Sequence, residues 1–292
     1  MKKLIAPAID PAEVFDTCID SVDDPGLVEK LNAARRLIID LFLGYTEKAQ
    51  NGELYTLPFC TRARPEQLIV ADLSKKELVS LYSNQLLQKG KAARKYYDRL
   101  IVSAPLGKCP LCGFGQATTL DHFLSKSRYP TFSVLPNNLI PACTDCNKSK
   151  GASVVTEGSQ QPHLYFEDSK FETDPWVFAE LIETTPPSIR YYVSPPVNWP
   201  PSLKLRAENH FKDLDLARRF GIEAAAELSG MVEILDDIGA LEDRKSHLER
   251  FATVERRNRT NTWKAPMYEA LAESAWFQQG GYKDFIQSPL IA

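Results

Sequence analysis

Residues 109–151 read CPLCGFGQATTLDHFLSKSRYPTFSVLPNNLIPACTDCNKSKG, and this stretch decides how the rest of the sequence is interpreted. It contains two Cys-x2-Cys pairs, Cys109 with Cys112 and Cys143 with Cys146, separated by 30 residues. Each pair has the spacing at which two thiolates bind one tetrahedral zinc ion. Four thiolates leave no open position on Zn²⁺, so we expect this ion to hold the fold together and not to activate water.

Other polar residues stand between and beside the cysteines. Asp121 and His122 are adjacent, Asn138 comes 16 residues after His122, and Asn147 directly follows the last cysteine. An imidazole can take a proton from water near neutral pH, and hard divalent cations prefer carboxylate and amide oxygens. The stretch therefore combines an imidazole with oxygen donors of the kind that a divalent cation prefers.

Together these residues resemble the zinc-bearing form of the HNH nuclease motif. The resemblance covers residues 109–151, 43 of the 292, and lies in three runs: Leu120-Asp121-His122, Pro136-Asn137-Asn138-Leu139, and Cys143-x2-Cys146-Asn147-x2-Lys150-Gly151. It implies a ββα-metal module, a two-stranded hairpin plus a helix. It also implies endonucleolytic hydrolysis that leaves a 5′-phosphate and a 3′-hydroxyl.

The resemblance also assigns roles to the four motif residues. His122 would be the general base, and Asn138 would position it. A divalent ion, Mg²⁺ or Mn²⁺, would bind Asp121 and the side-chain oxygen of Asn147. Many relatives have His at the last motif position, where this chain has Asn147. Binding of the ion therefore depends more heavily on Asp121.

Basic residues are concentrated around the motif. Between Lys89 and Lys150 there are ten basic and three acidic residues, a balance of +7 in a protein whose net charge is −3. Such a window is typical of a phosphate-facing surface, although a solvated helix face has the same composition. Within the motif we expect Lys126, Arg128, Lys148 and Lys150 to contact nucleic acid, with solvated charge as the alternative.

DNA is the expected substrate because HNH enzymes mostly cut DNA, while RNA is compatible with the same residues. The main alternative is a non-catalytic zinc ribbon that binds nucleic acid, but it leaves Asp121, His122 and Asn147 without a role. A second alternative is a nuclease subunit that stays inert until a partner ATPase activates it, similar to HNH proteins of bacterial phage defence. Cutting of both strands would favour a homodimer.

The rest of the sequence predicts an α+β, mainly α-helical protein in three regions: an N-terminal helical region (1–104), the HNH module (105–155) and a mostly helical domain (163–292). Helical spacing after an Asp-Asp-Pro start predicts a helix over 25–50. A Ser74-x-x-Glu77 capping box predicts a second helix toward Leu100, with Gly90 as a possible bend. The small, polar segment 152–162 is expected to be a linker.

Shorter elements are expected in the module and beyond it. Apolar pieces at 118–120 and 138–141 predict brief strands, followed by a helix from about Asp145. Alternation over 189–193 predicts a further strand. Helices are expected over 203–248, with an interruption near Gly221, and over 267–279.

The composition is that of a globular protein, because 43% hydrophobic and 25% charged residues argue against a disordered or fibrous chain. The first ten residues are too weakly apolar for a secretory signal, and the most apolar window, 37–43, contains Asp40. A cytoplasmic protein with no membrane partner is therefore expected. Cys18 and Cys60 lie beside apolar neighbours and are expected to be buried free thiols.

Overall fold

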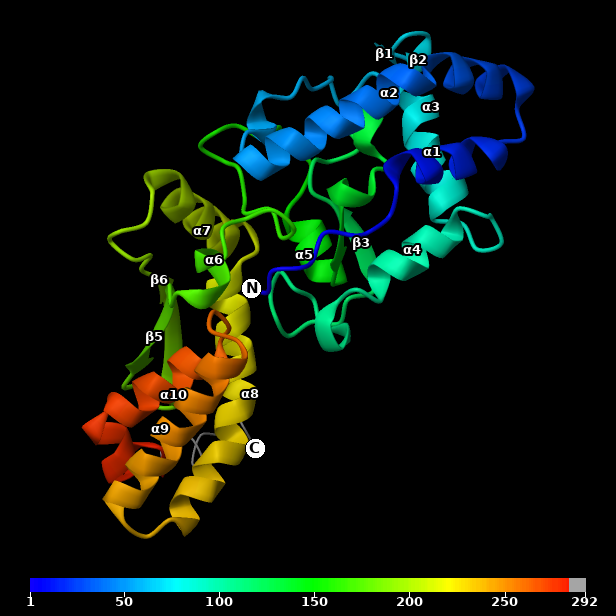
Figure 1. Ribbon diagram of the computed structural model, residues 1–292. Coiled ribbons are helices and arrows are strands. Elements are labelled where there is room, and N and C mark those ends of the chain that lie inside the picture. Colours follow the sequence, from blue (N-terminus) through cyan, green and yellow to red (C-terminus); the bar gives the residue numbers. More distant parts are fainter. Residues whose placement is uncertain (284–292) are drawn as a thin grey trace. The chain divides into compact units, whose positions relative to one another are not determined.

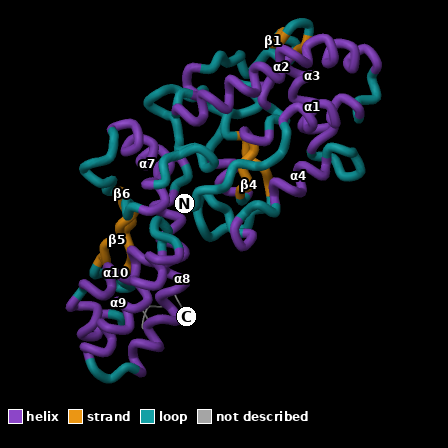
Figure 2. Tube along the Cα trace, in the orientation of Figure 1, coloured by secondary structure: helices purple, strands orange, loops and turns teal. Residues whose placement is uncertain are grey.

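The computed structural model describes residues 1–283, and this part of the chain forms two compact units. One unit comprises Lys3–Glu167 and so contains both the predicted N-terminal region and the predicted module; the other comprises Met1–Lys2 and the chain from Asp168 onward. Both combine helices with two-stranded sheets (Figure 1, Figure 2), in agreement with a mainly helical α+β fold. No helix within residues 1–283 has the length and hydropathy needed to span a membrane.

Two helices open the first unit. α1 (Pro11–Asp20) and α2 (Pro25–Asn51) each begin at a proline, and the side chains of Asp10 and Asp24 accept backbone N–H groups of the first turns. α2 ends at Gly52, whose φ of 71° is the left-handed conformation that commonly terminates a helix. The helix predicted over 25–50 is confirmed.

The helix predicted from Ser74 toward Leu100 is interrupted, and the bend expected at Gly90 is a full turn of the chain. The expected capping box is present and α3 (Lys75–Ser80) begins there, but the chain continues as a π-helix, η2 (Leu81–Leu86), then turns and forms α4 (Arg94–Ile101). Gly90 lies in the turn with a φ of 89°, a conformation that glycine adopts at little cost. The turn allows α4 to pack against strands that come later in the chain, and this packing outweighs helix continuity.

The motif stretch forms a hairpin and a helix. β3 (Thr119–His122) pairs antiparallel with β4 (Leu139–Ala142), and α5 (Thr144–Ser149) follows β4 with Cys143 as its N-cap. β3 runs between α5 and α4 (Figure 1). The two brief strands are confirmed, and the helix begins one residue before Asp145. The remaining short elements of this unit are η1 (Leu54–Thr56), β1 (Leu68–Val70), β2 (Leu73–Ser74), η3 (Pro105–Gly107), η4 (Pro130–Phe132) and η5 (Pro136–Asn138).

The segment expected to be a linker, 152–162, is part of the first unit. The side chain of Gln160 donates to the carbonyl of Gly52 at 3.0 Å and accepts the N–H of Tyr55 at 3.1 Å, which ties this segment to the end of α2. The boundary between the two units falls after Glu167.

The second unit is built around another antiparallel hairpin. α8 (Leu216–Asp237) packs against β6 (Ser188–Val193), and α10 (Lys264–Glu273) packs against β5 (Val177–Ile182). The strand predicted over 189–193 is confirmed. The interruption expected near Gly221 lies instead at Asp215, whose left-handed φ of 51° separates two helices. The other helices of this unit are α6 (Lys170–Thr173), α7 (Pro201–Asp213), α9 (Leu241–Asn258) and η6 (Phe277–Gly281).

Candidate functional site

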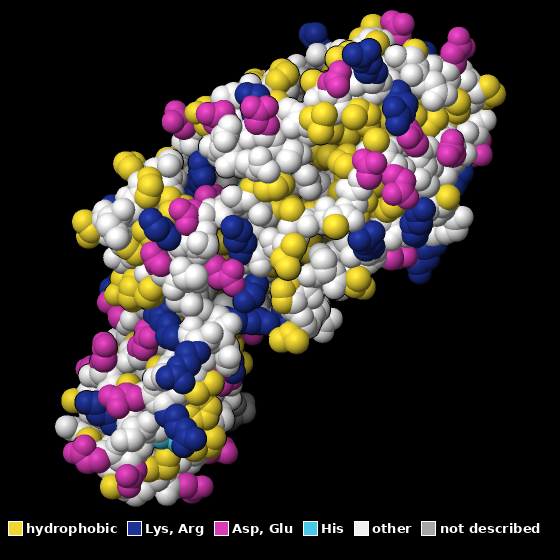
Figure 3. Space-filling model, in the orientation of Figure 1, with side chains coloured by type: hydrophobic (Ala, Val, Ile, Leu, Met, Phe, Trp, Pro, Cys, Tyr) yellow, Lys and Arg dark blue, Asp and Glu magenta, His cyan; other side chains and the backbone are white. Residues whose placement is uncertain are grey.

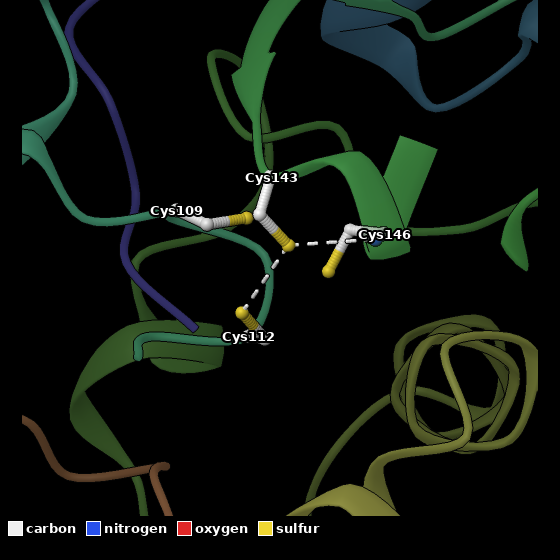
Figure 4. A group of neighbouring side chains, drawn as sticks. All are labelled: Cys109, Cys112, Cys143 and Cys146. Atoms are coloured by element: carbon white, nitrogen blue, oxygen red, sulfur yellow. Dashed lines mark hydrogen bonds between the residues drawn. The ribbon is translucent and has the colours of Figure 1, made fainter. Parts of the chain in front are cut away.

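The two Cys-x2-Cys pairs converge on one point (Figure 4). Cys109 and Cys112 come from a turn that precedes β3, and Cys143 and Cys146 come from the start of α5. All four are buried, and their sulfur atoms lie within 4.8 Å of one another. Cys112 Sγ and Cys143 Sγ are 3.9 Å apart, close to the separation of about 3.8 Å in a tetrahedron of about 2.3 Å metal–sulfur bonds. The cluster can therefore hold a metal ion, as the spacing predicted.

The backbone around this cluster is adapted to the sulfur atoms. The N–H of Gly115 donates to Cys112 Sγ and the N–H of Cys146 donates to Cys143 Sγ, both at 3.4 Å. Neighbouring thiols that donate to Cys143 hold its pKa well below the usual range. A Cβ at position 115 would lie 2.9 Å from Cys143 Sγ, so glycine is required there for steric reasons. The two other cysteines, Cys18 and Cys60, are buried free thiols, as expected.

Asp121, His122 and Asn147 line one cavity of about 330 Å³ in the first unit. Asp121 and His122 are the last two residues of β3, and Asn147 lies on α5, which packs against that strand. Asp121 is 6% exposed and His122 is 9% exposed. The structure thus brings together three residues that are up to 26 positions apart in the sequence.

The imidazole of His122 has a defined orientation. Its Nε2 lies 2.9 Å from the carbonyl oxygen of Ser133, which can only accept a hydrogen bond. Nε2 therefore carries the proton, and Nδ1 is the nitrogen that can accept one. The rings of His122 and Tyr82 pack edge to face, with their centroids 4.4 Å apart. Burial, with smaller contributions from Lys126 and Lys150, lowers the pKa of His122 to about 3, so the ring is neutral at pH 7.

The amide of Asn147 is also oriented by its neighbours. The hydroxyl of Thr119 donates to the carbonyl of Ala142 at 3.0 Å, so its oxygen must accept from Asn147 Nδ2, which lies 3.1 Å away. This fixes the amide nitrogen against β3. Oδ1 of Asn147 is consequently the atom that remains for a cation.

Asp121 has an ionic partner within the chain. Its Oδ2 accepts a hydrogen bond from Lys150 Nζ at 2.9 Å, and the two side chains are 8% and 13% exposed. Burial raises the pKa of the Asp121 carboxyl, and the Lys150 ammonium partly offsets that effect. Lys150 was expected to contact nucleic acid, whereas in the structure its ammonium is engaged with Asp121.

Asn138 is fully buried and holds the loop between the two strands. Its Oδ1 accepts the N–H of Leu124 at 2.7 Å, and its Nδ2 donates to the carbonyls of Leu124 and Phe132 at 3.1 and 3.0 Å. The imidazole of His122 donates to the carbonyl of Ser133, the residue after Phe132. Asn138 therefore holds the loop whose Ser133 carbonyl contacts His122, and its own side chain bonds to the loop backbone. The prediction that Asn138 positions the ring did not name this loop.

Sequence analysis missed two buried residues that support Asn138. The hydroxyl of Tyr45, on α2, lies 3.0 Å from Asn138 Oδ1 and 3.1 Å from His163 Nε2. Nδ1 of His163 accepts the N–H of Tyr165 at 3.3 Å, and burial lowers the pKa of His163 to about 3. Neither residue belongs to the motif. The sequence signal for Tyr45 is its hydroxyl group on an otherwise apolar helix stripe, because a buried hydroxyl needs a polar partner.

The other basic residues expected to contact nucleic acid lie in different settings. Lys126 lines the cavity with its Nζ 4.3 Å from the centre of the Tyr82 ring. Arg128 donates to the carbonyls of Cys60 and Ala152 at 3.3 and 3.4 Å, and Lys148 is exposed. On the face drawn in Figure 3, basic and acidic side chains are interspersed. Contact with nucleic acid stays a prediction for each.

These features define a class of protein in which a buried four-cysteine cluster adjoins a ββα element whose Asp, His and Asn side chains share a cavity. The chain is similar to Protein ea31 of Escherichia phage lambda, with 34% identity over an alignment of 303 residues that covers 96% of this chain and 100% of that protein. It belongs to the family of Protein ea31. No family model matches the chain, and no solved structure matches it.

Proposed function

We propose that this protein is a metal-dependent HNH endonuclease that hydrolyses phosphodiester bonds, with DNA as the expected substrate. The observation that carries the proposal is the shared cavity of Asp121, His122 and Asn147 on an antiparallel hairpin and helix. This is the arrangement that the HNH resemblance implies. RNA is compatible with the same chemistry, because the cavity residues address the phosphate and carry little sequence code.

His122 is the base in this proposal. Its Nδ1 accepts a proton from the attacking water, while the Ser133 carbonyl holds the ring through Nε2. The low pKa of the buried ring makes it a weak base in the free protein. A phosphate in the cavity brings negative charge beside the ring, which raises its pKa and stabilises the imidazolium that proton transfer creates.

Two metal sites with different roles complete the proposal. Asp121 and Asn147 Oδ1 offer the oxygen donors that Mg²⁺ or Mn²⁺ prefers, and such an ion, when bound, neutralises charge on the departing oxygen. We assign Zn²⁺ to the four cysteines because closed, all-sulfur tetrahedral sites in proteins are typical of structural zinc. Lys126, in the cavity wall, is the basic residue best placed to contact the phosphate.

The test is cleavage of supercoiled plasmid with Mg²⁺ or Mn²⁺ by the wild type, His122→Ala and His247→Ala, with zinc content measured for each. His247 lies in the second unit and is the matched control. We expect His122→Ala to slow cleavage by about 10²–10⁴-fold, the contribution of a general base, while its zinc content and the control's activity stay at the wild-type level. Full activity in His122→Ala would refute the assigned base.

The burial of Asp121 and His122 favours the second form of this proposal, a nuclease subunit that is active only with a companion protein. That companion is expected to be an ATPase, as in the phage-defence proteins that the motif resembles. In this form the isolated chain is inert, the co-purified complex cuts, and His122→Ala abolishes cutting by the complex. Binding of DNA without cutting by either the chain or the complex supports the zinc-ribbon alternative instead.

A further inference from the structure

Lys150 occupies a position that resembles a cation site. Its Nζ donates to Asp121 Oδ2 at 2.9 Å and to the carbonyl oxygen of His122 at 3.0 Å, and it lies 4.7 Å from the centre of the Phe123 ring. A carboxylate, a carbonyl and an aromatic face are groups that attract positive charge. With the Lys150 side chain only 13% exposed, this ammonium is enclosed by three consecutive residues of the β3 region.

The short helix α5 fixes where this ammonium lies. Lys150 caps the helix and its N–H donates to the carbonyl of Cys146 at 3.2 Å. Residues four apart on a helix lie on the same side, so Lys150 follows Cys146 on the side of α5 that faces β3. The helix that carries Cys146 therefore also carries the lysine to Asp121.

A divalent ion in this cavity would depend on the same carboxylate. Among the described residues that line the cavity, Asp121 is the one acid, and Asn147 offers a neutral oxygen. Asp121 is buried and the Lys150 side chain is only 13% exposed, so the two charges are screened less than a pair at the surface. An ammonium and a divalent ion on one buried carboxylate repel each other strongly.

We propose that Lys150 competes with the divalent ion for Asp121, so that the ammonium must be displaced before the metal binds. This inference rests on the proposed nuclease function. It reassigns Lys150, which the motif alone places among the phosphate contacts. It also makes metal and nucleic acid mutually supportive, because a phosphate in the cavity gives the displaced ammonium a new anionic partner.

The test is calorimetric titration of Mn²⁺ into the zinc-loaded full chain at pH 8. Lys150→Met removes the charge and keeps the length, whereas Lys150→Arg keeps the charge. The control is Lys76→Met, since Lys76 pairs with Glu66 but both side chains are more than 70% exposed. We expect Lys150→Met to bind Mn²⁺ about tenfold more tightly or better, and the other two variants to stay within about threefold of the wild type.

The outcomes separate this inference from the function on which it rests. Absence of Mn²⁺ binding in the wild type and in Lys150→Met refutes the proposed catalytic metal site, and with it both proposals. Binding by the wild type that is equal or weaker in Lys150→Met refutes the competition alone. Asp121→Asn supplies the baseline, because it removes the contested carboxylate.

A second measurement does not depend on a folded variant. Acetylation of lysines in the zinc-loaded wild type is followed by mass spectrometry with and without Mg²⁺. Lys150 is expected to be protected without Mg²⁺ and to become at least about threefold more reactive when Mg²⁺ binds, because an ion-paired, buried amine is released. Lys76 should not change. Equal reactivity of Lys150 at saturating Mg²⁺ contradicts displacement.

Discussion

The cysteine cluster and the Asp121 cavity are both buried, both involve α5, and yet they differ in how their polar atoms are satisfied. In the cluster, four equivalent sulfur atoms converge on one point and glycine fills the space beside them. Beside the cavity, Asp121 pairs with Lys150, and about 330 Å³ of space adjoins the carboxylate. Burial alone therefore does not distinguish the two places. The adjoining space and the single ion pair do.

The largest expected effect is the loss of one ligand from the cysteine cluster. Cys146→Ser should abolish binding of zinc and unfold the first unit, because structural zinc contributes about 10–16 kcal/mol to small zinc-dependent folds. Zinc content per chain and circular dichroism on heating measure the effect. Cys60→Ser, which alters a buried cysteine outside the cluster, should keep its zinc. A Cys146→Ser protein with a full zinc complement would show that the cluster is not the ligand set.

A smaller effect is expected at Asn138, which holds the loop between β3 and β4. Asn138→Ala leaves several buried partners without a hydrogen bond and should lower the free energy of unfolding by about 3–5 kcal/mol, with the zinc content preserved. Urea unfolding measures the loss. Asn137→Ala is the matched control, since the side chain of this half-buried neighbour donates to the Thr46 hydroxyl at 3.0 Å, outside the loop that Asn138 holds. Equal losses of unfolding free energy in the two variants would show that Asn138 does not hold the loop.

The smallest expected effect is a loss of folding stability at acidic pH. The pKa of His163 is about 3 in the folded chain against an ordinary value of 6.5, so the unfolded chain binds a proton first as the pH falls. Stability from this residue is complete above pH 6.5 and is lost between pH 6.5 and 3, with a limiting slope of about 1.4 kcal/mol per pH unit.

His163→Gln removes this titration. Urea unfolding at several pH values between 7 and 4 should show a shallower loss of stability in the variant than in the wild type. Parallel curves for the two proteins would show that His163 already titrates normally in the folded state. The cysteine cluster and His122 are the same in both proteins, so the difference between the two curves isolates His163.

Sequence reasoning reached the local features of this molecule and missed the distant ones. The cysteine spacing, the capping box at Ser74 and the two strands of the motif are encoded within a few residues of one another, and each was predicted. A bend at Gly90 was also expected, but the π-helix after α3 and the full turn before α4 were not, because packing of α4 on strands further along the chain favours them. The pair of Asp121 with Lys150 was not predicted, for another reason: a lysine that binds phosphate and one that binds a carboxylate look the same in a sequence.

The contact of Tyr45 with Asn138 and His163 also has a consequence for the growing chain. Its hydroxyl joins residues 93 and 118 positions away. Until His163 has left the ribosomal tunnel, a nascent chain has the complete motif but lacks one member of the polar group that locks its loop. Translation therefore completes the four cysteines before it completes the group of Tyr45, Asn138 and His163 that holds the loop.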